Sequence, residues 1–471
     1  MTMIDQFSET KKQLDDISPS MCAAKWNQVT LHLGTGTTHS CHHPTAHHIP
    51  VEELQDNPSA LHNTNFKKQQ RKLMLEGERP HECDYCWRVE DNAKQKSDSE
   101  VYSDRITKST EGWAKPYIRK LADMPWDVNI NPTYLEVDFD TTCNFKCAYC
   151  SPSYSTTWMQ EVKQHGAYKL PSTTFNSVEG LKIGTGLPIL QSEENPYVDA
   201  FWKWWPDAVK DLHVFRITGG EPLLSKNTFK ILDYIIENPQ PQMDFNINSN
   251  LGVPKDILDK FIEKISIIQD MKAVKEFKLF TSNEAHGKKA EYIRFGMKYD
   301  YWKENVHRIL REVSNSKVTM MCTFNALSVT SFTDFLKDML EIKLEYSDRH
   351  NRILPLSVDV PYLRHPGFLA PWILTENFLQ HIEESVSFMY RNAESPKWYP
   401  LAAKGFFDYE IHRMERLYYL VRDNMGNTES NLAQRKNFAA FIDEYDTRRG
   451  TNFFETFPEL EGFYHYCKND S

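Results

Sequence analysis

The chain has 471 residues and a mass of 55.2 kDa, and its 55 Lys and Arg against 65 Asp and Glu give a net charge of −10 at pH 7. This balance argues against attachment to nucleic acid through bulk positive charge, so nucleic acid is not an expected partner. No apolar run approaches the roughly 20 residues of a membrane span, and the polar N-terminus lacks the apolar segment of a secretory signal. We therefore expect a cytoplasmic protein with no membrane partner.

The first region, residues 1–115, is rich in His, Thr, Asn and Cys and shows little sustained periodicity. Apolar and polar residues alternate over 29–33, and the Gly-Thr-Gly sequence at 34–36 is typical of a turn. We predict a hairpin here that returns over 37–41. A short helix is predicted over 66–75.

The middle region, residues 116–365, alternates strand and helix patterns. Six strands are predicted, over residues 135–140, 213–218, 244–248, 276–281, 318–324 and 354–360. Helical stripes of apolar residues lie between them at 229–236, 257–262, 302–310 and 332–339. This alternation predicts an α/β fold with parallel strands and right-handed crossovers, either a doubly wound sheet or a barrel. The chemistry is then expected at the C-terminal ends of the strands.

The last region, residues 366–471, has no strand pattern. Helical patterns over 378–386 and 413–422 predict an all-helical region. The stretch from residue 150 to 212 is long for one crossover, which predicts an insertion. Its FWKWWP sequence at 201–206 is interpreted as core packing.

The cysteines indicate what kind of site to expect. An odd number of cysteines in two tight groups, without an export signal, favours thiolate ligands over disulfides. Two cysteines lie outside the groups. Cys322 is interpreted as a buried apolar residue, and Cys467 has no link to either group. The nine stand at positions 22, 41, 83, 86, 143, 147 and 150, with Cys322 and Cys467 outside the groups.

A C-x3-C-x2-C motif follows the first predicted strand of the middle region. Cys143, Cys147 and Cys150 lie within eight positions on the loop after that strand. Three thiolates can hold one corner of a cuboidal [4Fe–4S] cluster and leave its fourth iron open for a substrate or cofactor. The alternative is a structural zinc site completed by a distant His.

The second predicted strand ends in ITGGEPLL, residues 217–224. Gly219 and Gly220 lack a Cβ and allow a ligand to approach the backbone. Glu221 can accept a hydrogen bond from an ammonium group. The alternative interpretation of this segment is a plain turn.

These two motifs, one strand apart, resemble the radical SAM superfamily over residues 130–365. The resemblance implies a partial (β/α)6 barrel, open on one side. It also implies a [4Fe–4S] cluster on the three cysteines, with the amino and carboxylate groups of S-adenosylmethionine (SAM) on the open iron. The GGE segment is then expected to contact the amino group of SAM. Phe145 and Tyr149 match the aromatic or apolar positions of the family's cysteine loop, and Tyr149 is expected near the adenine.

Further SAM contacts are implied by later strand ends. INSNLG at 247–252 resembles a TNG-like segment of the family, with Asn248 and Ser249 facing the ligand. The segment after the fourth strand resembles one in which Ser282 meets the ribose and Arg294 meets the SAM carboxylate. Asn325, after the fifth strand, is a similar candidate. For each, the alternative is an ordinary polar strand end or helix cap.

A second group of cysteines lies in the first region. Cys22 precedes the predicted hairpin, Cys41 ends it, and Cys83 and Cys86 form a C-x2-C pair. The group resembles the twitch module, a shortened relative of the SPASM domain that holds an auxiliary [4Fe–4S] cluster. A zinc ribbon with four cysteine ligands is the alternative. The histidines of 41–48 can bind metal or form a solvated loop, and stay unassigned.

The expected organisation is therefore a twitch-like domain (1–115), a radical SAM partial barrel (116–365) and a helical C-terminal region (366–471). The resemblance implies an oxidoreductase or maturase that reductively cleaves SAM to a 5′-deoxyadenosyl radical and abstracts hydrogen from a substrate. A peptide or protein side chain is the first choice of substrate, modified by oxidation, cross-linking or epimerisation. A sugar or other small alcohol is the second choice. A reducing partner such as flavodoxin or ferredoxin is expected. A non-catalytic zinc-binding interaction protein is the alternative from another class.

Overall fold

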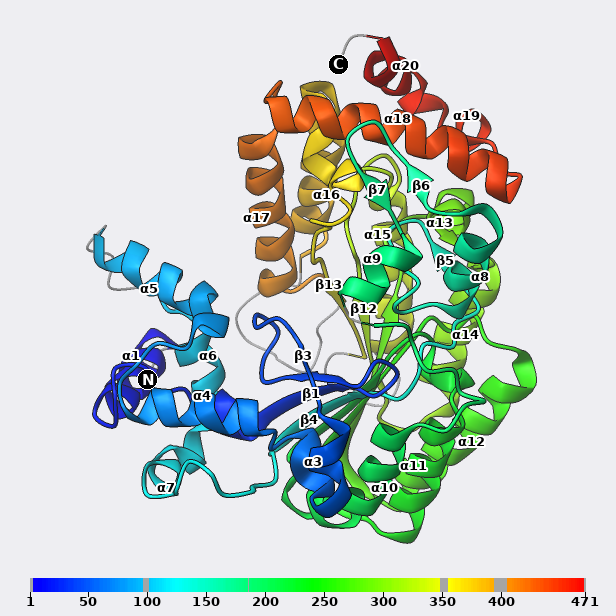
Figure 1. Ribbon diagram of the computed structural model, residues 1–471. Coiled ribbons are helices and arrows are strands. Elements are labelled where there is room, and N and C mark those ends of the chain that lie inside the picture. Colours follow the sequence, from blue (N-terminus) through cyan, green and yellow to red (C-terminus); the bar gives the residue numbers. More distant parts are fainter. Residues whose placement is uncertain (1–2, 96–100, 185, 348–354, 394–404, 470–471) are drawn as a thin grey trace. The chain divides into compact units, whose positions relative to one another are not determined.

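The computed structural model describes residues 3–95, 101–184, 186–347, 355–393 and 405–469 (Figure 1). The chain divides into two compact units, each assembled from several stretches of sequence. The first unit comprises Met1–Asp140, Pro188–Gly219 and Asn238–Asn246, and the second comprises Thr141–Leu187, Gly220–Glu237 and Ile247–Ser471. The three-region organisation expected from the sequence stays a prediction.

The first unit is built on a mixed group of strands. Their order is β8 (Val214–Thr218), β4 (Tyr134–Asp138), β1 (Gln28–His32), β2 (Thr37–His39) and β3 (His47–His48). β8, β4 and β1 are mutually parallel, whereas β1–β2 and β2–β3 are antiparallel. The predicted hairpin is confirmed. Its first strand also pairs with β4, a long-range pairing that local periodicity cannot reveal.

Helices accompany these strands in the first unit. They are α1 (Met3–Asp15), α2 (Ala24–Asn27), α3 (Val51–Asp56), α4 (Asn65–Leu75), α5 (Asp84–Gln95), α6 (Asp104–Thr110), α7 (Ile118–Ala122) and α10 (Pro196–Ala208). Short 3₁₀ turns lie at Pro58–Leu61, His81–Cys83, Lys115–Tyr117 and Val209–Asp211. The buried Trp205 of α10 packs against Phe215 of β8 with ring centroids 4.7 Å apart. The interpretation of the aromatic segment 201–206 as core packing is confirmed.

The second unit contains parallel strands in the order β13 (Leu356–Asp359), β12 (Lys317–Met321) and β10 (Val274–Ser282). β9 (Gln240–Ser249) has residues in both units. Two antiparallel pairs are short: β5 (Lys146–Cys147) with β11 (Arg294–Phe295), and β6 (Tyr168–Lys169) with β7 (Thr174–Phe175). All six strands predicted for the middle region are present, and residue 354 of the last one lies outside the described residues.

Helices alternate with the strands of the second unit and continue beyond them. They are α8 (Thr156–His165), α9 (Val178–Ile183), α11 (Lys226–Glu237), α12 (Lys255–Asp270), α13 (Gly287–Ile293), α14 (Tyr299–Glu312), α15 (Phe332–Ser347), α16 (Leu379–Arg391), α17 (Asp408–Asn424), α18 (Glu429–Arg449), α19 (Phe453–Thr456) and α20 (Glu461–Asn469). Short 3₁₀ turns lie at Pro222–Leu224, Gly367–Leu369, Pro371–Ile373, Glu376–Phe378 and Pro458–Leu460. The C-terminal helices, yellow to red in Figure 1, agree with the predicted helical region.

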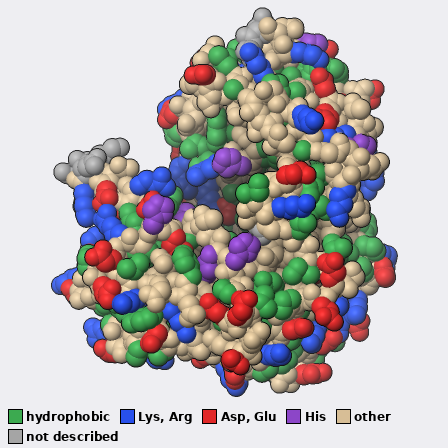
Figure 2. All heavy atoms as spheres, viewed as in Figure 1, with side chains coloured by type: hydrophobic (Ala, Val, Ile, Leu, Met, Phe, Trp, Pro, Cys, Tyr) green, Lys and Arg blue, Asp and Glu red, His purple; other side chains and the backbone are tan. Residues whose placement is uncertain are grey.

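The architecture is therefore α/β, with parallel strands, and the partial barrel stays a proposal. Because β10, β12 and β13 are parallel, their C-terminal ends share one edge. The isolated bridge between Phe324 and Tyr362 continues the pairing beyond β12 and β13. A search of the described helices found none that meets the length and hydropathy of a membrane span. Charged side chains of both signs are interspersed over the visible face in Figure 2.

Candidate functional site

The first unit brings its four cysteines to one place. Cys22 lies just before α2, Cys41 follows β2, Cys83 ends a 3₁₀ turn and Cys86 lies in the first turn of α5. All four line a single small cavity and none forms a disulfide. We call this group the four-cysteine site. Its members come from separate places along the first 90 residues, and their role as ligands stays a prediction.

The thiols of the four-cysteine site interact electrostatically. Burial raises the pKa of Cys41 to about 11 and that of Cys83 to about 12, and it also raises the pKa of Cys22 and Cys86. Negative charge on Cys22 further raises the pKa of the other three thiols. Several thiolates can therefore coexist here only with added positive charge, which a metal centre supplies.

Two buried cations accompany the four-cysteine site. Lys25 is 2% exposed and forms an ion pair with Glu82. Burial acts to lower the pKa of Lys25, but negative charge on Cys83 and Glu82 outweighs burial, so this pKa is raised. Arg105 donates from Nε to Glu90 at 2.8 Å. Each cation is thus fixed by a carboxylate while it remains beside the thiols.

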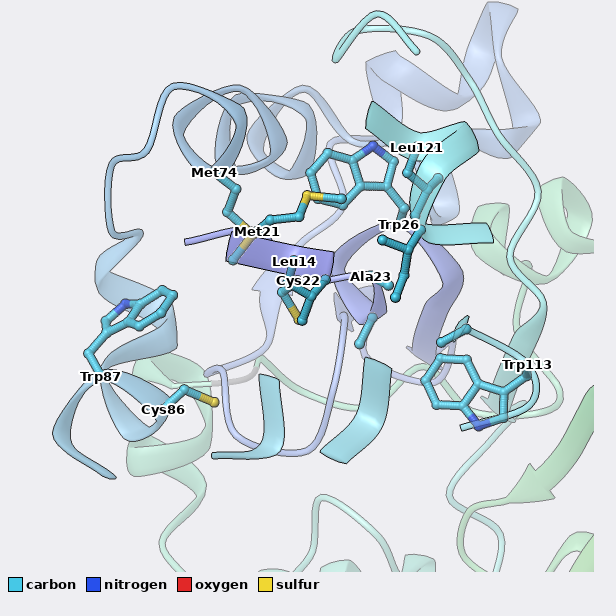
Figure 3. Close-up of a cluster of buried hydrophobic side chains, with 13 residues drawn as sticks. Leu14, Met21, Cys22, Ala23, Trp26, Met74, Cys86, Trp87, Trp113 and Leu121 are labelled. Carbon is cyan, nitrogen blue, oxygen red and sulfur yellow. The ribbon is translucent and has the colours of Figure 1, made fainter. Parts of the chain in front are cut away.

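Apolar side chains surround the same thiols. Cys22 and Cys86 belong to a buried cluster with Met74 and Trp87, and Figure 3 shows the two cysteines on separate segments, with Cys86 beside Trp87. The indole of Trp87 donates to the carbonyl of Pro80 at 2.9 Å, which ties α5, the helix of Cys86, to the start of the turn that ends at Cys83. The low local polarity strengthens any charge interaction within the site.

The histidines of 41–48 divide into two kinds. His43 donates from Nε2 to the carboxylate of Asp104 at 2.8 Å and stacks on Tyr85 with ring centroids 3.6 Å apart. His47 makes a hydrogen bond with Thr64 at 2.9 Å. His42 and His48, at the other two positions, are exposed. Of the four, only His43 lines the cavity of the four-cysteine site.

In the part of the chain that the structure describes, no group of three or more His, Cys, Asp and Glu side chains has the geometry of a site for one metal ion. In an iron–sulfur cluster each thiolate binds a different iron, so the sulfurs are farther apart than ligands of a single ion.

The second unit carries the three cysteines of the C-x3-C-x2-C motif on a loop that its neighbours hold in shape. We call residues 143–150 the cysteine loop. Cys147 lies in β5, where it pairs with Arg294 of β11. The N–H of Cys150 donates to the carbonyl of Cys147 at 3.0 Å, which forms a turn. The hydroxyls of Ser155 and Thr157, at the start of α8, both donate to the carbonyl of Phe145 at 2.8 Å.

Donors face the sulfurs of this loop. The N–H of Phe145 lies 3.4 Å from Cys143 Sγ, and the amide of Asn250 lies 3.9 Å from the same sulfur. The guanidinium of Arg294 lies 3.8 Å from Cys147 Sγ. Such contacts stabilise negative charge on sulfur, so they fit thiolate ligands.

The thiols of the loop are half-buried and need positive charge to ionise. Burial raises the pKa of Cys150 to about 12 and also raises the pKa of Cys143 and Cys147. Arg294 and Arg449 act in the opposite direction on Cys147 and Cys150. Charge on Cys147 raises the pKa of both other thiols, so the three are close enough to interact.

Phe145 of the loop is buried against two glycines. A Cβ on Gly252 would lie 2.3 Å from the Phe145 ring, and a Cβ on Gly296 would lie 2.9 Å from the carbonyl of Asn144. Gly296 also has φ of +110°. These glycines explain how the loop packs so closely, and no sequence motif gives them this role.

The GGE segment approaches the loop through backbone contacts. A Cβ on Gly220 would lie 2.5 Å from the carbonyl of Thr142, and the N–H of Glu221 donates to that carbonyl at 2.7 Å. In the first unit, a Cβ on Gly219 (φ +131°) would lie 3.1 Å from the carbonyl of Asp140. The close approach that these glycines permit is therefore to the chain itself.

Glu221 is fully buried and strongly hydrogen-bonded. Its carboxylate accepts from the N–H of Asn250 (2.6 Å), the hydroxyl of Ser249 (2.7 Å) and the N–H of Leu223 (3.0 Å). Burial nevertheless raises the pKa of Glu221 to about 7. Ser249 is thus a partner of Glu221. Asn250, which the sequence analysis passed over, links Glu221 to Cys143, and its place at the carboxyl end of β9 was the available signal.

Tyr149 and Arg294 meet at a carboxylate that the sequence analysis did not assign. Arg294 forms a buried ion pair with Glu284, and the hydroxyl of Tyr149 donates to Glu284 at 3.2 Å. Burial raises the pKa of Glu284 although Arg294 and Tyr149 oppose this. The charge of Arg294 is therefore shared between Glu284 and Cys147. The predicted contacts of Tyr149 with adenine and of Arg294 with the SAM carboxylate remain predictions.

The remaining candidates differ in their burial. Ser282 is half-buried at the end of β10, and Asn248 is half-buried on β9. Asn325 is fully buried, donates to the carbonyl of Thr323 at 2.9 Å and accepts from the N–H of Leu327 at 3.0 Å. Its amide is thus held within its own turn, the arrangement given above as the alternative.

The C-terminal region supports the cysteine loop directly. Arg449, at the end of α18, donates to the carbonyl of Lys146 at 2.5 Å and pairs with Glu161 at 3.1 Å. Its guanidinium lies 4.5 Å from the centroid of the Trp158 ring. No sequence signal pointed to this residue, because 303 positions separate it from Lys146.

Comparison with known proteins finds a distant relative. A stretch of 139 residues, 28% of this chain, is 27% identical to the GTP 3′,8-cyclase of Aliarcobacter butzleri (strain RM4018) and covers 41% of that protein. No family model matches the chain, and no solved structure matches it. The relative is a radical SAM enzyme, so this similarity supports the radical SAM superfamily for the chain, without reaching its substrate or reaction.

Proposed function

We propose that this chain is a radical SAM enzyme whose second unit holds a [4Fe–4S] cluster on Cys143, Cys147 and Cys150. The observation that carries the proposal is the set of donors around the cysteine loop, where backbone N–H, amide and guanidinium groups face the sulfurs. The distant similarity to a radical SAM enzyme supports it independently.

The donor set fits the cluster and its cofactor. Three thiolates leave one iron of a cuboidal cluster without a protein ligand, which is the position for the amino and carboxylate groups of SAM. When bound, a reduced cluster supplies the electron that cleaves SAM, and the resulting 5′-deoxyadenosyl radical abstracts a hydrogen atom from the substrate.

The residues of the second unit would prepare this site. Glu221 has three hydrogen bonds in place and an additional lone pair, which would accept one from the ammonium group of SAM. Because its carboxylate is fully buried, neighbouring side chains must move aside for this contact. Arg294 would hold the loop through Cys147 while Glu284 balances its charge.

We assign a second, auxiliary [4Fe–4S] cluster to the four-cysteine site. Four thiolates would complete its ligand set, so its role would be electron relay rather than substrate binding. Lys25 and Arg105 favour an anionic cluster with four thiolate ligands. Twitch-like architecture for residues 1–115 belongs to this proposal.

For the substrate, we propose a peptide or protein side chain, with an oxidoreductase or maturase reaction as its outcome. A low-potential reductant such as flavodoxin or ferredoxin would supply the electron. The resemblance to maturases with auxiliary clusters supports this choice.

The test begins with protein purified without oxygen. We expect about eight irons and a matching amount of sulfide per chain, because each site would hold four irons. After reduction with dithionite, liquid chromatography with mass spectrometry should detect 5′-deoxyadenosine formed from SAM. Protein that carries only zinc and leaves SAM intact would contradict the proposal and favour a non-catalytic zinc-binding protein.

A further inference from the structure

A cavity of about 560 Å³ lies in the second unit, between the segment after β13 and one face of α17. Its volume is in the range of small-molecule sites. Side chains on α17 spaced by three and four residues share one helix face and line the cavity. The lining side chains that matter here are Tyr362 and Arg364 from the segment, and Arg413, Arg416, Leu417 and Leu420 from α17.

Positive charge predominates in this cavity. Three arginines line it, against one carboxylate, that of Asp359. Asp359 forms an ion pair with Arg413 and so offsets a single guanidinium. Arg364 donates to the hydroxyl of Tyr362 at 2.6 Å. Within the described ranges, Arg416 has no hydrogen-bond or ion-pair partner, so its donors are available to a ligand.

The cavity lies at the carboxyl ends of parallel strands, where α/β proteins usually bind their ligands. β10, β12 and β13 are parallel, so their carboxyl ends meet at one edge, which also carries Ser282. The N–H of Leu363 donates to the carbonyl of Phe324 at 2.9 Å, which aligns the segment after β13 with the end of β12. Tyr362 and Arg364 flank Leu363 and therefore follow the same strand ends.

We propose that this cavity binds an oxyanion of the substrate, a carboxylate or a phosphate group. A guanidinium presents a planar fork of donors that matches the paired oxygens of either group. Leu417 and Leu420 offer apolar contact to the carbon skeleton beside the anion. That the bound molecule is the substrate rests on the proposed function. The binding of an anion in this cavity does not depend on SAM chemistry.

Equilibrium binding tests the proposal on the full chain without SAM. Isothermal titration calorimetry would be run with sodium phosphate and with glutarate, and with neutral glutaramide as the comparison for shape. We expect saturable binding of at least one anion, weakened by added salt, and no binding of glutaramide. Arg416→Gln and Arg364→Gln should each weaken anion binding about tenfold, because each removes a charge-assisted hydrogen bond. Preference for phosphate indicates a phosphorylated substrate, and preference for glutarate a carboxylate-bearing one.

A matched control lies on the same helix. Arg422 of α17 is exposed, pairs with Asp423 and does not line the cavity, so Arg422→Gln removes one charge without touching the proposed site. This variant should bind anions like the parent. No saturable binding of either anion, or equal weakening in all three variants, would overturn the proposal. Anion binding by protein that fails to cleave SAM would reject the proposed function and leave the anion site standing.

Discussion

The two cysteine sites differ in how the chain assembles them and in what surrounds them. The four-cysteine site gathers thiols from four elements and is bordered by apolar side chains such as Met74 and Trp87. The cysteine loop holds three thiols within eight residues and is bordered by polar groups such as Asn250 and Glu221. A complete set of four thiolates needs no further ligand, whereas three thiolates leave a position open. The polar border thus lies at the site that we propose to bind a cofactor.

The two sites agree in their charge environment. In each, buried cations lie beside the thiols and are held by carboxylates. Placing a buried cation against a carboxylate fixes its position and avoids an uncompensated buried charge. A protein with net negative charge can thereby provide local positive potential at both sites. The pairs are Lys25–Glu82 and Arg105–Glu90 at the first site, and Arg294–Glu284 and Arg449–Glu161 at the second.

Removing one thiol from each site should separate their roles most strongly. Cys147→Ala should abolish SAM cleavage, because two thiols cannot hold the cluster that binds the cofactor. Cys86→Ala should retain part of the SAM cleavage but lose turnover of substrate, because only the auxiliary site is damaged. Iron content and 5′-deoxyadenosine formation measure both effects.

Cys467→Ala is the matched control for the loss of one thiol. Cys467 is buried in α20 and belongs to neither group. This variant should keep the iron content and SAM cleavage of the parent. Equal SAM cleavage by Cys147→Ala, Cys86→Ala and the parent would contradict the division of roles between the sites.

The sequence allowed prediction of features that depend on local pattern. Strand periodicity such as that of 135–140 and the apolar stripes of the helices located their elements, because alternation with a period of two or 3.6 residues reflects burial. The spacing of Cys143, Cys147 and Cys150 likewise placed three thiols on one loop. The aromatic segment 201–206 was correctly interpreted as core.

The unpredicted features depend on contacts between distant residues. Arg449 supports the cysteine loop from the far end of the chain, and Glu284 stands between Tyr149 and Arg294. The sequence alone does not reveal whether a given Arg or Glu forms an ion pair or faces solvent. The contact of Gly252 with the Phe145 ring is likewise visible only in three dimensions.

Removing the anchored arginine from each site should destabilise both units and distinguish their metal centres. Arg105→Met leaves the buried Glu90 without its cation, so we expect a loss of about 3–5 kcal/mol in the free energy of unfolding. Arg449→Met leaves Glu161 paired with Lys146 alone, so we expect a smaller loss for this variant. Urea denaturation measures this loss. Arg449→Met should also reduce the iron at the cysteine loop, and Arg105→Met the iron at the four-cysteine site, as spectroscopy of the two clusters would report.

Arg422→Met is the control, because Arg422 is exposed and surface substitutions usually change stability by less than about 0.5 kcal/mol. If Arg449→Met and Arg105→Met were as stable as this control, the ion pairs with Glu161 and Glu90 would not anchor the sites.

The smallest expected effect is a pH dependence of the free energy of unfolding. It arises at the cysteine loop, from Glu221, and has no counterpart in the four-cysteine site. The pKa of Glu221 in the folded protein is raised from 4.5 to about 7 by burial. Between these values the folded state holds a proton on Glu221 that the unfolded state has lost, so the contribution of Glu221 to the free energy of unfolding is highest below pH 4.5 and falls as pH rises towards 7. The difference between the two pKa values corresponds to roughly 3 kcal/mol in the free energy of unfolding. Glu221→Gln keeps an acceptor but cannot ionise, so its stability relative to the parent should rise over this window.

Ser249→Ala sharpens the same measurement. The hydroxyl of Ser249 donates to the Glu221 carboxylate and lowers its pKa, so its removal should move the upper end of the window to higher pH. Urea unfolding of the parent, Glu221→Gln and Ser249→Ala at a series of pH values measures both shifts. Parallel pH profiles for the parent and Glu221→Gln would mean that Glu221 is ionised throughout the window, with its three hydrogen bonds outweighing burial.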